Sequence, residues 1–211
     1  MSTATGANNV KELRERTGAG FLECKKALEH TENNIEKAID FLREKGLAAA
    51  SKKMGRSAND GRIHAYIHGA GKVGVLVEIN CETDFVAKTD QFTEFVNNVA
   101  LHIAAVNPRY LTKEEVSAAD LDRERAIFKV QAEESGKKGP IVDKIVEGKL
   151  GKFYEENCLL HQKYVKEPEK TIDALVREQI TKLGENITIK RFVRFQLGEG
   201  TVKTAATAAA E

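Results

Sequence analysis

The chain has 211 residues, and its 33 lysines and arginines nearly balance its 32 aspartates and glutamates. This balance excludes a strong general attraction to nucleic acid or to an anionic membrane. No run of about 18 apolar residues occurs, and the start lacks a basic segment followed by an apolar one. We therefore expect a cytoplasmic protein that binds neither a membrane nor nucleic acid directly.

The three cysteines are far apart in the sequence and form no C-x-x-C pair: Cys24, Cys81 and Cys158. This spacing predicts neither a disulfide framework nor a zinc site. We expect each thiol to be buried as a small hydrophobic group in a reducing compartment.

Residues 8–46 have the pattern of three short helices. The first is predicted to end at Gly18, and the third to begin at Asn33, with Glu36 completing its cap, and to end near Gly46. So small a bundle has little core of its own and should lean on the rest of the chain. Helical spacing puts one apolar face of the second helix at Phe21, Cys24, Ala27 and Leu28.

Residues 47–60 lose this periodicity and are predicted to be a linker or an extended helix end. They contain a basic cluster, Lys52, Lys53 and Arg56. The cluster could contact phosphate, but no aromatic residues are interleaved with it, so a solvated surface is the favoured interpretation.

Three segments alternate with the period of a β-strand. Residues 62–68 place Ile63, Ala65 and Ile67 on one face, and residues 73–81 return after a Gly-rich turn, which predicts a hairpin. The turn does not have phosphate-loop spacing and leads into a strand. A third antiparallel strand is predicted at residues 186–197, with one face formed by Ile187, Ile189, Val193, Phe195 and Leu197.

Four further helices are predicted between the hairpin and the third strand. The strongest amphipathic pattern ends at Asn107, and Thr112 with Glu115 has the form of a capping box. Residues 119–136, 140–156 and 171–184 follow, the second of these starting at Pro140. The fold class is α+β, with about three antiparallel strands packed with helices. The apolar positions of the strongest helix are Phe92, Phe95, Val96, Val99, Ile103 and Val106.

Catalytic signatures are missing from the sequence. His64 and His68 share a strand face, but the strand rise places them about 13 Å apart, which is too far for one metal ion. No dinucleotide fingerprint, nucleophile elbow or H-E-x-x-H motif occurs. We expect a binding protein that is not an enzyme and has no cofactor and no metal site.

Two stretches, residues 10–46 and 77–92, resemble the family of translation elongation factor Ts, the nucleotide exchange factor of EF-Tu. The first contains T-G-A-G and C-K-K-A-L, and the second contains T-D-F-V-A. Further similar stretches in the same order extend the resemblance over residues 9–200.

The resemblance implies a flexible N-terminus at residues 1–8 and a ubiquitin-associated-like (UBA-like) three-helix domain at 9–46. After the 47–60 linker, it implies an α+β core and dimerisation domain at 61–200, and the Ala-rich tail at 201–211 should be disordered. Compared with longer members, the chain is expected to hold one copy of the core module and to lack a coiled-coil excursion. A homodimer with a second copy is therefore one expectation.

The resemblance also implies how the chain acts on GDP-bound EF-Tu. Thr83, Asp84, Phe85 and Val86 would dislocate magnesium, with Phe85 inserted as a wedge between helices of the nucleotide domain, so that GDP leaves and GTP can bind. From the residues alone, Phe85 is more often a local hydrophobic staple on the next helix. N-terminal residues that could contact the partner are Val10, Leu13, Arg14, Thr17 and Gly18.

Two other functions stay open at this point. The chain could be a binding module whose helical head recruits ubiquitin-like or ribosome-associated proteins while its core dimerises. An RNA-binding function would rest on the basic cluster alone, and would show a strong dependence on salt.

Overall fold

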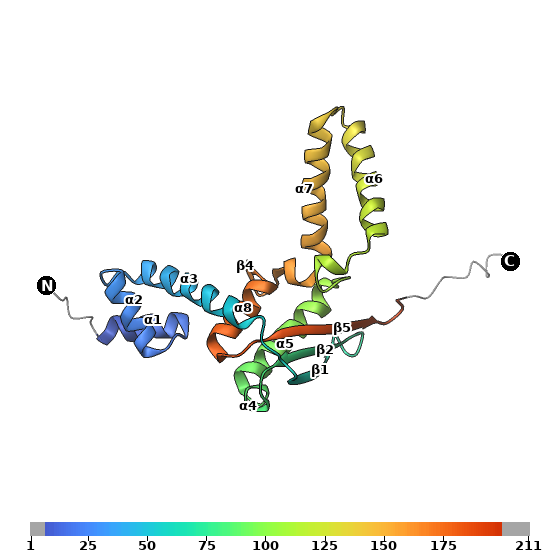
Figure 1. Ribbon diagram of the computed structural model, residues 1–211. Helices are drawn as coiled ribbons and strands as arrows, with labels where there is room; N and C mark the ends of the chain where they lie inside the picture. Colours follow the sequence, from blue (N-terminus) through green and yellow to red (C-terminus); the bar gives the residue numbers. More distant parts are fainter. Residues whose placement is uncertain (1–6, 200–211) are drawn as a thin grey trace.

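The computed structural model describes residues 7–199, and Figure 1 shows them as three parts. A head of three helices leads into a core of helices and an antiparallel sheet, and two further helices project from the core. The predicted α+β class is confirmed. The elements are α1 (Ala7–Thr17), α2 (Phe21–His30), α3 (Ile35–Lys53), β1 (Asp60–His68), β2 (Val73–Cys81), α4 (Asp84–Ala87), α5 (Asp90–Val106), a 3₁₀ turn (Lys113–Glu115), α6 (Ala118–Glu134), α7 (Pro140–Asn157), a second 3₁₀ turn (Leu159–His161), β3 (Lys163–Tyr164), β4 (Glu167–Thr171), α8 (Ile172–Leu183) and β5 (Thr188–Gln196).

A flexible N-terminus is predicted at residues 1–8 and a disordered tail at residues 201–211. Residues 1–6 and 201–211 lie outside the described residues. Residues 7 and 8 already belong to α1.

The three helices of the head are confirmed, and they enclose a small core. Their UBA-like character stays a prediction. Two local predictions are wrong. Asn34, and not Asn33, caps α3 by accepting a hydrogen bond from the Lys37 amide at 3.0 Å. Phe21 is 55% exposed, because it is the first residue of α2 and helical side chains point toward the N-terminus, here beyond the bundle. The buried residues of the head are Val10, Leu13, Cys24, Ala27, Leu28 and Ala38.

α3 does not end near Gly46 but continues to Lys53, so much of the predicted linker is the extended helix end. The extension packs along α8, where Thr181 donates a hydrogen bond from Oγ1 to the Gly46 carbonyl at 3.0 Å. The tertiary contact with α8 therefore stabilises the helix in residues that lack helical apolar periodicity.

The sheet has the order β1-β2-β5 and both pairings are antiparallel, which confirms the hairpin and the third strand. One face of the sheet, the inner face, packs on α5 within the main core. All the predicted apolar positions of α5 are buried except Val106. From β2 the inner face receives Val75, Val77, Ile79 and Cys81.

The three apolar residues of β1 share one face, as predicted, but this face is not the one that packs on the core. Ile63, Ala65 and Ile67 point to the opposite, outer face and are exposed, while Tyr66 packs against the core. The pairing decides this, because Tyr66 lies opposite the buried Val75 and so shares its face.

The single alternating face predicted for the third strand is also wrong. The register shifts where Glu78 pairs with Arg191 and Ile79 with Ile189, so β5 carries one extra residue. Such a bulge moves the following side chains to the other face of the sheet. Ile189 is buried before the bulge, whereas Val193 and Phe195 after it are exposed on the outer face.

α6 and α7 form an antiparallel hairpin that projects from the core (Figure 1), so the expected absence of a coiled-coil excursion is wrong. Pro140 begins α7 as predicted. The capping box before the hairpin is not formed as predicted, because Glu115 accepts its hydrogen bond from the Leu111 amide at 2.8 Å while the side chain of Thr112 caps nothing. The hairpin encloses its own apolar cluster of Ala132, Val142, Val146 and Leu150.

The three cysteines are buried and unpaired, as predicted. Burial raises the pKa of Cys81 and of Cys158 to about 11, so both are neutral thiols. Over residues 7–199, no helix has the length and apolar character that crossing a membrane requires. The same residues contain no group of three or more histidine, cysteine or acidic side chains arranged to hold a metal ion.

Candidate partner-binding site

Residues 83–86 form the turn that joins β2 to the four-residue helix α4. Thr83 has an extended backbone, with φ of −133°, and its Oγ1 accepts a hydrogen bond from the Val86 amide at 3.4 Å. The Sγ of Cys81 lies 3.1 Å from the Thr83 carbonyl oxygen, to which it donates. Thr83 thus caps α4 and fixes where its first residues point.

The Phe85 side chain is 80% exposed. Val86 and Ala87 lie on the other side of the turn, where Val86 packs against the main core and Ala87 is buried. The alternative prediction, that Phe85 is a local hydrophobic staple, is therefore wrong, because a ring packed on the next helix would be largely covered. The turn instead buries one side and presents an aromatic ring on the other.

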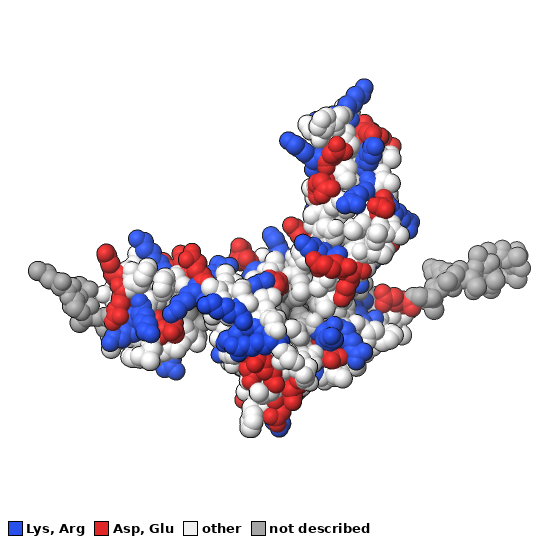
Figure 2. All heavy atoms as spheres, in the orientation of Figure 1, with Lys and Arg blue, Asp and Glu red and all other residues white. Residues whose placement is uncertain are grey.

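Asp84 beside this ring is an ionised acid. Lys88 Nζ lies 2.6 Å from Asp84 Oδ2, and this hydrogen bond is the main cause that lowers the pKa of Asp84 below its ordinary value. Figure 2 shows acidic side chains gathered over the α4 end of the core. The ring is thus presented within an acidic surface.

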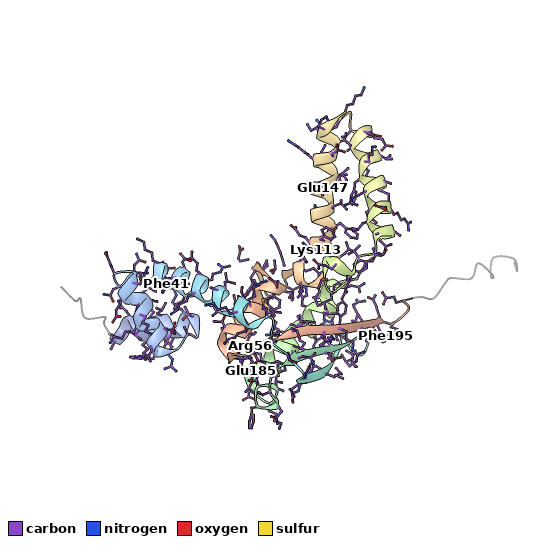
Figure 3. All side chains as sticks on the ribbon, viewed as in Figure 1. Phe41, Arg56, Lys113, Glu147, Glu185 and Phe195 are labelled. Atoms are coloured by element: carbon purple, nitrogen blue, oxygen red, sulfur yellow. The ribbon has the colours of Figure 1, made fainter. Side chains whose placement is uncertain are left out.

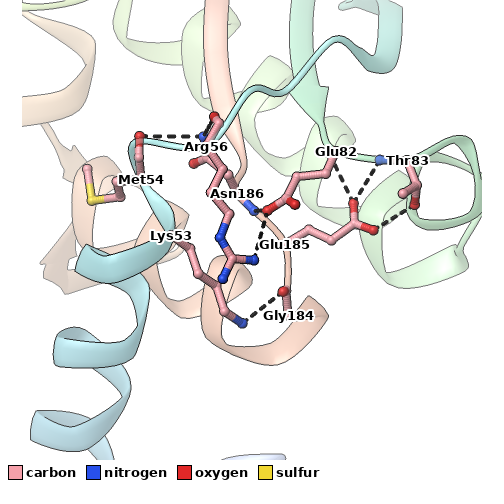
Figure 4. Close-up of polar contacts among 8 residues, drawn as sticks. All are labelled: Lys53, Met54, Arg56, Glu82, Thr83, Gly184, Glu185 and Asn186. Carbon is pink, nitrogen blue, oxygen red and sulfur yellow. Dashed lines mark hydrogen bonds and ion pairs between the residues drawn. The ribbon is translucent and has the colours of Figure 1, made fainter.

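Glu185, which lies between α8 and β5, holds the base of the turn (Figure 4). Its Oε2 accepts hydrogen bonds from the Glu82 and Thr83 amides, both at 3.0 Å, and its Oε1 accepts one from Thr83 Oγ1 at 2.6 Å. In return, the Glu82 carboxylate accepts a hydrogen bond from the Asn186 amide at 2.6 Å. Two segments about one hundred residues apart in sequence are thereby joined through charge-assisted hydrogen bonds.

Comparison with known proteins identifies the family. The family model described as Elongation factor TS matches residues 5–199. A protein named Elongation factor Ts from Thermoanaerobacter sp. (strain X514) is 60% identical over 194 residues, 92% of this chain and 95% of that protein. Its namesake from Desulfitobacterium hafniense is 56% identical over 211 residues, 100% of this chain and 97% of that protein. The chain belongs to the elongation factor Ts family. It is accordingly a translation elongation factor.

Two of the three basic residues after the head bind the core of this elongation factor Ts chain. Lys53 donates from Nζ to the Gly184 carbonyl at 2.8 Å, and Arg56 Nη1 lies 3.6 Å from Glu82 Oε1. Asn186 donates from Nδ2 to the Arg56 carbonyl at 2.6 Å. Figure 3 shows Arg56 and Glu185 near each other, away from the end of β5 that carries Phe195. Lys53 and Arg56 thus hold the linker against the core, and fewer basic side chains remain to contact phosphate.

The five N-terminal candidates of this elongation factor Ts chain fall into two groups. Val10 and Leu13 are buried in the head, where they contribute packing. Arg14 and Gly18 are exposed, and Thr17 is half-buried with its hydroxyl donating to the Leu13 carbonyl at 2.6 Å. Figure 1 shows α1 within the head and α4 at the bottom of the core, apart from each other, so these candidates and the Phe85 turn do not form one site.

Sequence reasoning missed two groups of residues around these sites. Phe21 and Leu22 at the start of α2 are exposed and apolar, which only the end position of Phe21 in its helix could have indicated. Glu185 and Asn186 could not be found from local sequence, because their partners lie about one hundred residues away.

Proposed function

We propose that this chain is a guanine nucleotide exchange factor that binds GDP-bound EF-Tu and promotes release of GDP so that GTP can bind. Membership of the elongation factor Ts family implies EF-Tu as the partner. The observation that carries the proposal is the exposed Phe85 ring on a capped turn whose base is hydrogen-bonded to the core.

The four residues of the turn have different tasks in this mechanism. Phe85 enters between helices of the nucleotide domain of EF-Tu and separates them, which disturbs the magnesium coordination that holds GDP. Asp84 places a negative charge beside the inserted ring. Thr83 caps the helix, and Val86 anchors it to the core. The chain needs no active site or cofactor for this, because exchange follows from binding.

Binding energy limits what the ring achieves alone. Each tenfold loss of GDP affinity requires about 1.4 kcal/mol of differential binding. Burial of one Phe side chain supplies about 1.5 to 3 kcal/mol, which corresponds to one or two powers of ten. A larger effect needs further contacts, and the exposed Arg14, Gly18, Phe21 and Leu22 of the head are the surface we assign to them. Since coupling is reciprocal, GDP lowers the affinity of EF-Tu for the factor by the same ratio as the factor lowers its affinity for GDP.

The test follows release of a fluorescent GDP from EF-Tu after addition of catalytic amounts of the factor and an excess of unlabelled nucleotide. Wild type should accelerate release, and Phe85→Ala should lower the maximal rate about tenfold to a hundredfold, by the energies above. Val130→Ala removes an exposed apolar side chain from the projecting hairpin and serves as the control, with a rate equal to wild type. Full acceleration by Phe85→Ala, or none by wild type, would defeat the proposal.

We also propose that two copies pair through the outer face of the sheet. Neighbouring strands align apolar residues there, since Ala65 lies opposite Leu76, which in turn lies opposite Val193. Ile67 and Phe195 extend this apolar surface along the flanking strands, and both are exposed. An exposed sheet face of this kind is typical of a protein contact.

A further inference from the structure

We propose that Glu185 is a positioning residue for exchange: its carboxylate sets the orientation in which α4 presents Phe85. This inference rests on the proposed function and deepens it, because it concerns how the ring is held before EF-Tu is met. Nothing in the chemistry of the ring itself requires a carboxylate, so the two ideas can fail separately.

The hydroxyl of Thr83 is the first link between Glu185 and the ring. Thr83 Oγ1 donates a hydrogen bond to Glu185 Oε1 at 2.6 Å, and Thr83 Oγ1 itself accepts one from the Val86 amide at 3.4 Å. The carboxylate therefore directs the hydroxyl proton away from α4 and leaves the oxygen lone pair free to cap the helix. Without Glu185, that hydroxyl can rotate and the cap loses its fixed direction.

The backbone before α4 is the second link. The Glu82 and Thr83 amides both point at Glu185 Oε2. Consecutive amides held by one oxygen fix the peptide planes through which β2 enters the turn, and so fix the exit direction of α4. Phe85 stands only two residues beyond this point, and a change in those planes would swing the ring.

The position of Glu185 in the chain makes it a firm base. It follows Gly184, which ends α8 in the left-handed conformation with φ of +79°. The Gly184 carbonyl accepts a hydrogen bond from the Lys53 ammonium. Asn186, the next residue, binds the linker through the Arg56 carbonyl. The same short segment thus ties the end of α3 to the β2–α4 turn, so the head and the ring share one anchor (Figure 4).

The test is the GDP release assay with Glu185→Ala, measured as a function of factor concentration. We expect the maximal rate to fall about tenfold, within the range that the ring can supply, while the half-saturating concentration changes less than about twofold because the head still binds. Glu115→Ala is the matched control: it also removes a carboxylate that accepts a backbone amide, but at Leu111 before the hairpin. A Glu115→Ala variant as slow as Glu185→Ala, or an unchanged maximal rate in Glu185→Ala, would overturn the proposal.

Two further measurements separate positioning from general loss of structure. In a Phe85→Ala background, Glu185→Ala should slow release no further, because both changes remove the same wedge, and a full additional loss would overturn the proposal. Amide hydrogen exchange of the free factor should quicken at residues 83–88 in Glu185→Ala and not in Glu115→Ala, and unchanged protection there would also overturn it. This last measurement needs no EF-Tu, so it tests positioning even if Phe85→Ala shows the proposed exchange mechanism to be wrong.

Discussion

His102 lies fully buried on α5, and its two ring nitrogens have different partners. The Val165 amide donates to Nδ1 at 3.3 Å, so the ring proton sits on Nε2 and is donated to Gln162 Oε1 at 3.0 Å. Burial lowers the pKa of His102, and the hydrogen bond that His102 donates to Gln162 opposes this in part. The folded protein therefore holds a neutral imidazole that joins α5 to the segment before α8.

This arrangement predicts loss of stability in mild acid. Below pH about 6.5 the unfolded chain binds a proton at His102 that the folded chain resists, so the free energy of unfolding falls as the pH drops from 7 to 5. Each unit by which folding lowers the pKa contributes about 1.4 kcal/mol to this fall. Urea unfolding at the two pH values measures it, with His102→Gln as the comparison. An equal fall in wild type and in His102→Gln would contradict the prediction.

At the scale of the element, β1 depends on one glycine. Gly61 has φ of +137°, and a Cβ there would lie 2.2 Å from the Ile79 carbonyl oxygen and 2.6 Å from the Asn80 Cα. Both atoms belong to the backbone of the neighbouring strand, so neither can rotate away. Gly61 allows β1 to approach β2 beside the turn that carries Phe85.

We therefore expect Gly61→Ala to lower the free energy of unfolding by about 3 kcal/mol or more, from backbone strain and the clash together. Gly69→Ala isolates the strain, since Gly69 has φ of +58° but no atom within 4 Å of a new Cβ. That change should cost only about 1 kcal/mol. Chemical denaturation of both variants provides the comparison, and equal losses would show that close approach of the strands does not matter at Gly61.

At the scale of the whole molecule, the outer face of the sheet presents an apolar surface that stays exposed within residues 7–199. Leu76 stands at its centre on the middle strand, between Ala65 and Val193. Two such faces would pack as a sandwich and remove Phe195, which is 70% exposed, from water.

Pairing predicts a species of twice 23.3 kDa in sedimentation equilibrium. Leu76→Asp should weaken the affinity between the two copies by about a hundredfold or more, because a buried unpaired carboxylate costs several kcal/mol. Ile127→Asp, an acid placed on the exposed side of α6, is the control and should pair like wild type. A monomeric wild type at tens of micromolar concentration would refute the pairing.

Local patterns predicted the elements of the core and head well. α5 and α8 were predicted from their apolar spacing, and β5 was predicted as the partner of the hairpin, because helices and strands with one buried face carry their period in the sequence. The predictions failed where another element decided the outcome. β1 turned its isoleucines outward because its pairing with β2 placed Tyr66 on the core side, and α3 ran past Gly46 because α8 supports it.

At the candidate site, the sequence alone predicts that the T-D-F-V-A segment follows an apolar strand and that an aromatic residue stands at the start of a helix. The exposure of the Phe85 ring and the hydrogen bonds between Glu185 and the base of the turn are seen only in the folded chain. The physical reason is range: helical and strand periods arise from neighbours a few residues apart, whereas burial and the partners of a carboxylate depend on segments that folding brings together from distant parts of the chain.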